Sequence, residues 1–598
     1  MQQPPRERTS RARRVNSALS GMPVATTPVY VSAALRQRWP QFPSVRRSFA
    51  FRRTFLLLCL CGLLLGFCYV LLYPLLVDAL PDSASTQALG RAFPWLVDLF
   101  WTRRVPFLVA LLARVPWFDL RDHSPAAAAH LALLVLVLAA GFLWLAARVC
   151  GHATRERVRP ERMRLLLGLI CFFALLSGTL MVFLPGGISQ DTLLSGLYGR
   201  MVVFYHANPY VAGSTLLVHD PVYRALPSGT FVSPLTGPLW SDLAVPIAWL
   251  AQGNPAFILL DFRIAGLLFH LLNICLLWAV LARLKPEVRL LGTLFYAWNP
   301  VVLLLGVGEM HTELVVIFFL LLGAFCLQRR ALLASWICVL LAALVYPFCL
   351  LLLPLFLKAL VKETRAMSRG ERAFWWCKLL LFSLLASVLA YIPYWPGLGI
   401  DGIALHLSQS LWQSTAQNSL LTALGNLPFA TWPPVAWLLI PQHWMLLPAL
   451  LVGGLLLLGI WIIDNLELAL LFGSWIFLAL VVLLPVGSPW LVLLPLALAL
   501  ASSSRRTALL AHLLTCGALV AYGLALAASR WSGQALVTVG LPVLFWGWTL
   551  FFLSTWRMTH HESTEPAPPA RKRRGLSRPS WPSRPAAWPS SRPGARKW

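Results

Sequence analysis

Charge is scarce in this sequence. Only 12% of the 598 residues are Asp, Glu, Lys or Arg, and no Lys or Arg lies between Lys378 and Arg505. Hydrophobic residues instead make up 58% of the chain, and the mean hydropathy is +0.72. A soluble protein of this length needs a polar exterior, so the composition excludes a soluble protein.

The cysteine patterns of a disulfide-linked fold or of a zinc site are also missing. The eleven cysteines include no Cys-x-x-Cys pair, and nearly all of them lie within apolar runs. We interpret them as small buried hydrophobic residues. The first apolar run begins near Thr54, too far from the N-terminus for a signal peptide, so we expect it to be a true membrane span.

Long apolar runs dominate the sequence. Many are about 18–23 residues long, enough to cross a membrane as helices that satisfy their own backbone hydrogen bonds. The sequence therefore predicts an all-α polytopic membrane protein with about 12–14 transmembrane helices in the multi-pass domain 54–556. The pair at 331–361, broken by VYPF, is alternatively a re-entrant hairpin. The runs are 54–77, 126–148, 164–184, 255–283, 289–307, 312–328, 331–345, 347–361, 374–395, 443–463, 466–485, 488–503, 507–528 and 534–556.

The net charge of +27 lies mainly in two tails. Residues 1–53 contain eleven Arg and one acidic residue, and residues 557–598 contain ten Lys or Arg and two acidic residues. Both tails are rich in Pro and Ser without a periodic apolar pattern, so we expect them to be disordered. Their charge suits anionic lipid on the cytoplasmic side, and we expect no nucleic-acid partner.

The distribution of Lys and Arg predicts how the chain crosses the membrane. Basic residues cluster on alternate connections such as 148–164, although 78–125 is an exception. By the positive-inside rule, these connections and both termini face the cytoplasm. The sequence thus predicts a multi-pass protein of the cell membrane, with 185–242, the turn near Glu309 and 396–431 on the outer side.

The outer loop 185–242 contains a candidate catalytic carboxylate. Asp191, Ser195 and Tyr198 have the spacing of one helix face, which predicts an amphipathic helix lying on the outer membrane surface. Asp191 has two interpretations. It is either the acid of an active site or a first-turn carboxylate behind an N-cap at Ser189, where the helix dipole stabilises it by roughly 0.3–1 kcal/mol.

A second group of polar residues lies in one turn between two apolar runs. Glu309, His311 and Glu313 place two carboxylates and an imidazole within five residues, without a basic neighbour. The carboxylates would repel each other, and a metal ion, a cationic partner or a shared proton would relieve that repulsion. The spacing is not the HExxH of a zinc protease. The alternative is that these residues only anchor helix ends at the membrane interface.

Asp261 and Arg263 lie inside the apolar run 255–283. Ionisable groups within a span are costly and often mark a binding site or a pathway. A guanidinium matches the oxygens of a lipid phosphate, so Arg263 is a candidate phosphate ligand. The alternatives are a structural ion pair or side chains that reach the outer interface. We interpret His270, deeper on the same helix, as a residue that packs against a neighbouring helix.

Three segments carry a wider pattern: QDTLLSGLYGRMVVFYHANPYV (190–211), SPLTGPLW (233–240) and WNPVVLLLGVGEMHTELVVIFFLLLG (298–323). With two later Pro-containing helices, they resemble the polytopic glycosyltransferases of the GT-C fold. The nearest likeness is to the glycosyltransferase 87 group and the bacterial polyprenol-phosphate-mannose-dependent mannosyltransferases. It covers about residues 165–505. The turn differs, since that family often has Gly-His-Asn-Asp where this chain has Glu-Met-His-Thr-Glu.

The resemblance implies a transferase that moves a hexose, such as mannose, from a polyprenyl-phosphate donor to a glycan or lipid acceptor on the outer side. Asp191 would take the proton of the acceptor hydroxyl, which displaces the lipid phosphate with inversion. Arg263 and Arg200 would hold the donor phosphate. No cofactor is implied with certainty, and a divalent cation is left open. The residues that would bind substrate are Tyr198, Asn208, Glu309, His311 and Glu313.

A transporter or flippase for lipid-linked saccharides is the alternative function. Such a protein would favour internal repeats and charged groups near the middle of the membrane. The sequence shows no convincing repeat, and its polar groups gather on the predicted outer side. The long outer loop and this one-sided polarity favour the enzyme.

Overall fold

The computed structural model describes residues 43–98, 124–155, 160–226, 233–365, 367–412, 428–438, 440, 443, 446–483, 489–502 and 505–528. All regular elements in these ranges are helices, and no strand occurs among them. The all-α prediction is therefore confirmed for this part of the chain. The predicted span 534–556 and the tail 557–598 lie outside the described residues, as does the N-terminal tail up to residue 42.

The chain divides into two units, Met1–Leu57 and Leu58–Trp598. The described part of the first unit is helical and forms the beginning of α2. The larger unit contains the rest of α2 and every other helix, and the following description concerns that unit.

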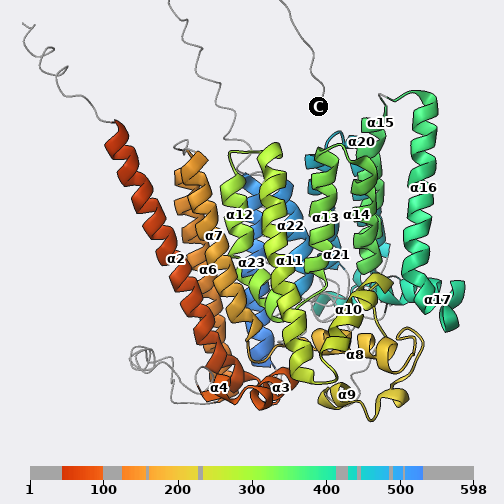
Figure 1. Cartoon of the computed structure of the whole chain (residues 1–598), viewed down its shortest axis with the longest axis horizontal. Coiled ribbons are helices and arrows are strands. Elements are labelled where there is room, and N and C mark those ends of the chain that lie inside the picture. Colours follow the sequence, from red (N-terminus) through yellow and green to blue (C-terminus); the bar gives the residue numbers. More distant parts are fainter. Residues whose placement is uncertain are drawn as a thin grey trace, which may run out of the picture. The chain divides into compact units, whose positions relative to one another are not determined.

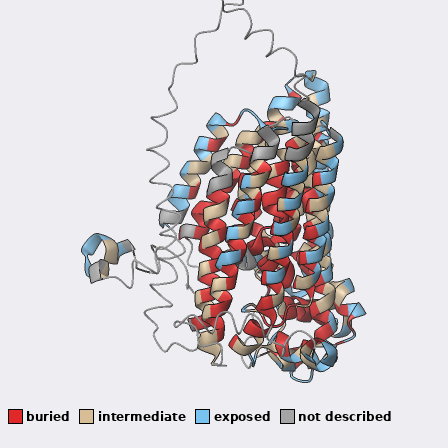
Figure 2. Cartoon of the chain, turned by 90° about the vertical axis from the view of Figure 1, so that its left-hand side faces the viewer, coloured by how far each residue is buried: buried red, intermediate tan, exposed pale blue. Residues whose placement is uncertain are grey.

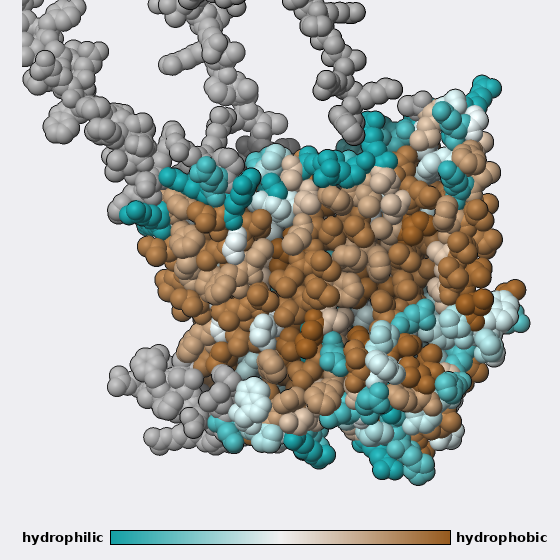
Figure 3. All heavy atoms as spheres, in the orientation of Figure 1, coloured by the Kyte–Doolittle hydropathy of each residue, from teal (hydrophilic) through white to brown (hydrophobic). Residues whose placement is uncertain are grey.

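Within the described residues, six helices are long and apolar enough to span a membrane, or seven if the bent pair α12 and η3 forms one span. Five further apolar helices are shorter. Figure 3 shows hydrophobic atoms across the middle of the larger unit, with hydrophilic atoms gathered at its two ends. The long helices are α2 (Pro43–Ala79), α6 (Pro125–Arg155), α7 (Pro160–Val182), α11 (Pro255–Leu284), α16 (Arg369–Tyr391) and α23 (Arg505–Ala528).

The helix limits follow the predicted apolar runs closely. The predicted run 255–283 is α11, for example, which begins where Asn254 caps the amide of Ala256 and Pro255 occupies the first turn. The VYPF break separates α14 from η4 at Tyr346. The other helices of the central part are α12 (Arg289–Ala297), η3 (Val302–Gly308), α13 (Glu313–Gln328), α14 (Leu332–Val345), η4 (Pro347–Leu352) and α15 (Leu353–Thr364). Those of the last part are α19 (Pro433–Leu438), α20 (Leu446–Ile462), α21 (Leu466–Leu483), η7 (Pro489–Val492) and α22 (Leu493–Ser502).

One helix sits at the centre of the packing. α11 contacts α7, α12 and α13, and its buried residues include the polar side chains Arg263, His270 and Asn273. His270 lies 3.2 Å from the carbonyl oxygen of Ala297 and stacks on Tyr296. The interpretation of His270 as a helix-packing residue is thus confirmed. Figure 2 shows that buried residues fill the interior of the helix bundle down to its lower end.

Short helices collect at the lower end of the larger unit in Figure 1, and we call this region the α8 end. Hydrogen bonds join the predicted outer segments there. The amide of Ile188 donates to Glu309, for example, and the side chain of Asn208 donates to the carbonyl of Pro396. The helices of this end are α3 (Ala84–Ala92), α4 (Pro94–Leu96), α8 (Asp191–Phe204), η2 (Ser214–Leu217), α9 (Pro221–Ala225), α10 (Pro238–Leu250), η5 (Ile392–Tyr394) and α17 (Trp395–Trp412).

The helix expected after Gln190 is present as α8, but it does not lie free on a surface. Nine of its residues are buried, from Thr192 to Met201, because α10 and α11 pack against it. A Cβ at Gly199 would come within 2.5 Å of the backbone oxygen of Ala244, so this glycine permits the close contact with α10. The N-cap of α8 is Gln190 and not the expected Ser189, whose hydroxyl accepts a hydrogen bond from the Asp191 amide from one position further out.

At the same end of the larger unit, α17 begins with a kink. Gly397 and Gly399 have positive φ values of 84° and 57°, which glycine adopts at little cost. Together with Gly402 they have the spacing of a nucleotide-binding glycine loop. That loop requires a preceding strand, and here the preceding element is the helical turn η5, so the pattern builds a kink instead.

The entry to α10 gives a test of this packing. A Cβ on Gly237 would lie 2.1 Å from the backbone oxygen of Leu344, and a backbone atom cannot rotate away. We expect Gly237→Ala to destabilise the protein by about 1–3 kcal/mol and to lower its thermal midpoint in detergent. Gly453→Ala is the control, because a Cβ there meets nothing within 4 Å. Equal midpoints for the two variants would contradict the close contact between α10 and α14.

Candidate functional site

Two carboxylates and an imidazole form a chain at the α8 end. Asp191 is the first residue of α8, and Glu309 and His311 lie in the turn between η3 and α13. Asp191 Oδ2 is 3.3 Å from His311 Nδ1, and Glu309 Oε2 is 3.3 Å from His311 Nε2. The side chain of Asp191 is 47% exposed, whereas those of His311 and Glu309 are 2% exposed. Of these three side chains, only that of Asp191 is accessible to solvent.

Other segments hold this chain of polar groups in place. The ring of Trp490 stacks on His311, with 4.1 Å between centroids and 10° between planes. Glu309 Oε1 accepts hydrogen bonds from the Tyr522 hydroxyl at 2.8 Å and from the Ile188 amide at 2.9 Å. The inner carboxylate and the imidazole are therefore fixed by residues from three distant parts of the sequence, which leaves Asp191 as the accessible end.

The surroundings of His311 keep it charged. Burial by itself would lower the pKa of His311, since it disfavours the imidazolium form. The hydrogen bonds to Asp191 and Glu309, together with the charges of Asp191 and Glu313, outweigh burial and raise this pKa to about 9. Protonated His311 donates from both ring nitrogens, and Trp490 covers its face as in a cation–π contact. His311 is thus the cationic partner that relieves carboxylate repulsion at this turn.

The backbone around these groups is tightly constrained. Met310 has a φ of 46°, which is rare for a residue other than glycine, and the preceding η3 is a π-helix. On the facing loop, Gly186 has a φ of 54°, and a Cβ on Gly187 would lie 2.8 Å from Glu309 Oε1. Strained backbone and π-helical turns often accompany functional sites. The pair Gly186-Gly187 allows the loop to approach Glu309 so closely.

Glu313 lies one turn further, at the start of α13. Its side chain is buried, and the Thr312 hydroxyl lies 3.4 Å from its Oε2 atom. The charge of Glu313 acts on His311. Among the described residues, no group of three His, Cys, Asp or Glu side chains is arranged to hold a metal ion.

Arg200 points to a different partner. Its Nε and Nη2 atoms each lie 2.8 Å from Oδ2 of Asp220, which is fully buried and also accepts a hydrogen bond from Tyr205. Arg200 thereby ties α8 to the cap of α9, and its Nη1 atom is buried without a partner among the described residues. A role of Arg200 in binding phosphate stays a prediction, and it would require phosphate to share the guanidinium with Asp220.

Arg263 is buried in α11 close to the turn that holds Glu309. Its Nη1 atom donates to the carbonyl oxygens of Val182 at 3.2 Å and Leu184 at 2.7 Å, where α7 ends. Its Nε atom is buried without a partner in the described part of the chain. The guanidinium therefore satisfies orphan carbonyls of α7, and its role toward a donor phosphate stays a prediction.

Tyr198 lies within α8, and Asn208 lies in the loop that follows it. Asn208 Nδ2 donates to the carbonyls of Tyr394 at 2.6 Å and Pro396 at 3.1 Å, and so joins this loop to α17. Tyr198 is buried in α8, two turns from Asp191. The structure therefore brings Asp191, Glu309, His311 and Glu313 together and places Arg200 and Asn208 in separate contacts.

Sequence reasoning missed the residues that support the chain of polar groups. Trp490 lies in SPWLVLLP, where the tryptophan between a turn and an apolar run was the available signal. Tyr522 lies in the last third of the apolar helix α23 without any local signal. Asp220 was readable as a helix cap before Pro221, but its pairing with Arg200 was not. Contacts of this kind join residues far apart in the sequence.

No protein-family model, no curated protein and no solved structure matches this chain.

The charge on His311 predicts that stability depends on pH. Its pKa rises from 6.5 to about 9 on folding, so the protonated form stabilises the fold by roughly 3 kcal/mol. Because the folded pKa is the higher one, this contribution is complete below pH 6.5 and is lost as the pH rises through about 9. We expect the thermal midpoint to fall over that range, and His311→Gln to flatten the dependence.

The exposed His219 supplies the control for this measurement. His219→Gln should keep the pH dependence of the wild-type protein, because this side chain lies outside the chain of polar groups. If the thermal midpoint depends on pH equally in the wild-type protein and in His311→Gln, folding does not raise the pKa of His311.

Proposed function

We propose that this protein is a membrane glycosyltransferase that moves a hexose from a polyprenyl-phosphate donor to a glycan or lipid acceptor. The observation that carries the proposal is the half-exposed carboxylate of Asp191, held by a buried, protonated His311. A base that reacts with an incoming hydroxyl must be accessible and fixed in position. Asp191 meets both conditions, and its supporting groups are shielded from water.

The proposed reaction is a direct displacement. The acceptor hydroxyl gives its proton to the free oxygen of Asp191 while its own oxygen attacks the anomeric carbon. The bond between that carbon and the phosphate oxygen breaks, and its electron pair leaves with the lipid phosphate. The configuration of the anomeric carbon is inverted. His311 and Glu309 hold the Asp191 carboxylate in place throughout, since their own atoms are buried.

The donor phosphate requires a cation. Arg263 has an unpaired Nε–H group close to the end of α7, and Arg200 has an unpaired Nη1 group at the end of α8, among the described residues. Guanidinium groups match phosphate oxygens and would stabilise the charge of the leaving lipid phosphate. Arg263 is the better candidate, because no carboxylate accepts a hydrogen bond from it in this part of the chain.

The membrane arrangement belongs to the same proposal. It is a GT-C-like architecture of about 12–14 spans in the cell membrane, with both termini cytoplasmic and the α8 end outside. Basic residues at the opposite helix ends support this orientation. Arg283 donates to the carbonyl of Gln328 there, and Lys362 pairs with Asp464.

Replacement of the proposed base tests the reaction. Asp191→Asn keeps the size of the side chain but cannot take a proton, so we expect kcat to fall by about 100- to 10,000-fold. The assay follows radiolabelled hexose from a polyprenyl-phosphate donor into glycan in membranes that contain the protein. Asp401→Asn is the matched control, because Asp401 is an exposed carboxylate of α17. It should transfer hexose at the wild-type rate.

Turnover of Asp191→Asn at the wild-type rate would remove Asp191 as the base. If the wild-type protein instead carries labelled donor across sealed vesicles without forming a product, the chain is a transporter.

A further inference from the structure

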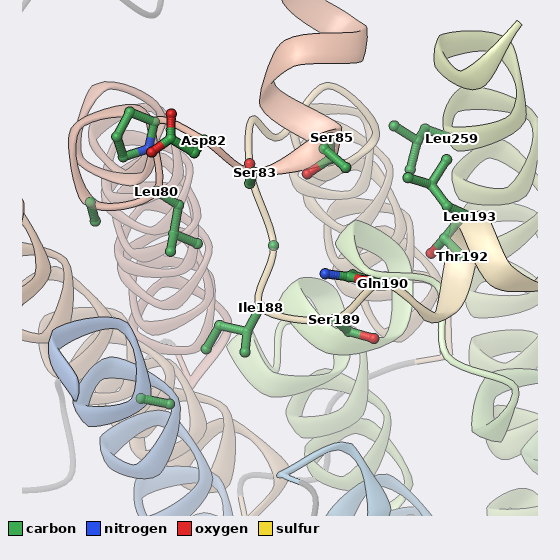
Figure 4. A pocket seen from close by; sticks show the side chains of 15 residues that line it. Leu80, Asp82, Ser83, Ser85, Ile188, Ser189, Gln190, Thr192, Leu193 and Leu259 are labelled. Carbon is green, nitrogen blue, oxygen red and sulfur yellow. The ribbon is translucent and has the colours of Figure 1, made fainter. Parts of the chain in front are cut away.

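A pocket of about 400 Å³ lies beside Asp191 at the α8 end. One wall is the turn between α2 and α3, and the opposite wall is the loop that leads into α8 (Figure 4). Leu259 of α11 and Ala525 of α23 also line it. The volume falls within the range of sites for small molecules. Neither Asp191 nor His311 lines the pocket, so it adds a separate space next to the chain of polar groups.

Several polar side chains that line the pocket have no hydrogen-bond partner in the described structure. The hydroxyl of Ser85, the amide of Gln190 and the carboxylate of Asp82 make no hydrogen bond within the described residues, and all three line the cavity. Figure 4 shows Gln190 on the loop that leads into α8 and Ser85 on α3. By contrast, Ser83 bonds to Thr86, and Thr192 donates to the carbonyl of Glu309. The side chains of Ser85, Gln190 and Asp82 are therefore able to form hydrogen bonds with a ligand in the pocket.

The chemistry of the lining selects the kind of ligand. No Lys or Arg lines the pocket, and Asp82 is its one charged residue, so a phosphate or other anion is disfavoured. Hydroxyl, amide and carboxylate groups pair well with sugar hydroxyls. Leu80, Ile188 and Leu193 add apolar surface for the C–H faces of a sugar ring. The lining therefore fits a neutral molecule that is rich in hydroxyl groups.

The pocket shares its wall with the proposed base. Gln190 and Thr192 line the cavity, and Asp191 stands between them in the chain. The pocket therefore lies directly beside the residue proposed as the base.

We propose that this pocket binds a neutral saccharide, the acceptor end of a glycan, and directs one of its hydroxyls toward Asp191. The inference rests on the proposed transferase function. It assigns the acceptor to Ser85, Gln190 and Asp82, and leaves the donor to the cationic side of the site. Gln190 makes the central contact in this proposal.

Binding without transfer tests the proposal. The full-length Asp191→Asn protein, in amphipol and without donor, is titrated with mannotriose, maltotriose and cellotriose, and binding is followed by saturation-transfer NMR. We expect at least one trisaccharide to bind. Gln190→Leu in the same background should weaken that binding about tenfold, since it removes hydrogen bonds but keeps the volume. Gln87→Leu is the matched control, because Gln87 is an exposed glutamine of α3 outside the pocket.

Each result decides the matter. Trisaccharide binding that weakens in Gln190→Leu and persists in Gln87→Leu supports the pocket, provided that the thermal midpoints agree. Binding of none of the three sugars, equal binding by both variants, or competition by inorganic phosphate would overturn it. Failure of the transfer reaction is distinguishable, because saccharide binding here needs no donor. If the protein transfers hexose and Gln190→Leu leaves the acceptor KM unchanged, the transferase function stands and this pocket is not the acceptor site.

Discussion

A protonated imidazole between two carboxylates organises the α8 end of this protein. His311 is buried, so its charge is tolerated only because Asp191 and Glu309 lie 3.3 Å from its two nitrogens. Glu309 in turn needs Tyr522 and the Ile188 amide to satisfy its other oxygen. If any one of these groups moved, a buried charge would remain without a partner. This requirement fixes the loop before α8, the turn before α13 and the C-terminal part of α23 relative to one another.

The same constraint accounts for the unusual backbone nearby. On the His311 side, the chain turns through the π-helix η3 and the positive φ of Met310. On the facing loop, Gly186 and Gly187 allow the close approach to Glu309. Such strain persists only where surrounding contacts compensate for it. The result is one carboxylate, Asp191, that is held rigidly and remains open to the outside next to a pocket of free hydroxyl and amide groups.

Helix positions were predictable because each apolar run must be long enough for its environment and must end where polar residues begin. The runs 255–283 and 312–328 correspond closely to α11 and α13. The helix that begins at Asp191 was also predicted from spacing, but its burial against α10 was not, because the sequence does not show which helix a glycine faces. The grouping of Glu309, His311 and Glu313 was visible, whereas the aromatic partners Trp490 and Tyr522 were not.

The sequence by itself determined that the chain is helical, that long apolar helices could cross a membrane, and that acidic residues concentrate in a few connections. These properties follow from composition and local period, which every residue carries with it. Only the tertiary structure decided that Asp191 meets His311, that Arg200 is paired with Asp220, and that the α2–α3 turn forms a pocket with the loop before α8. Each of these depends on contacts between residues far apart in the chain, which are set by the packing of whole helices rather than by any local pattern.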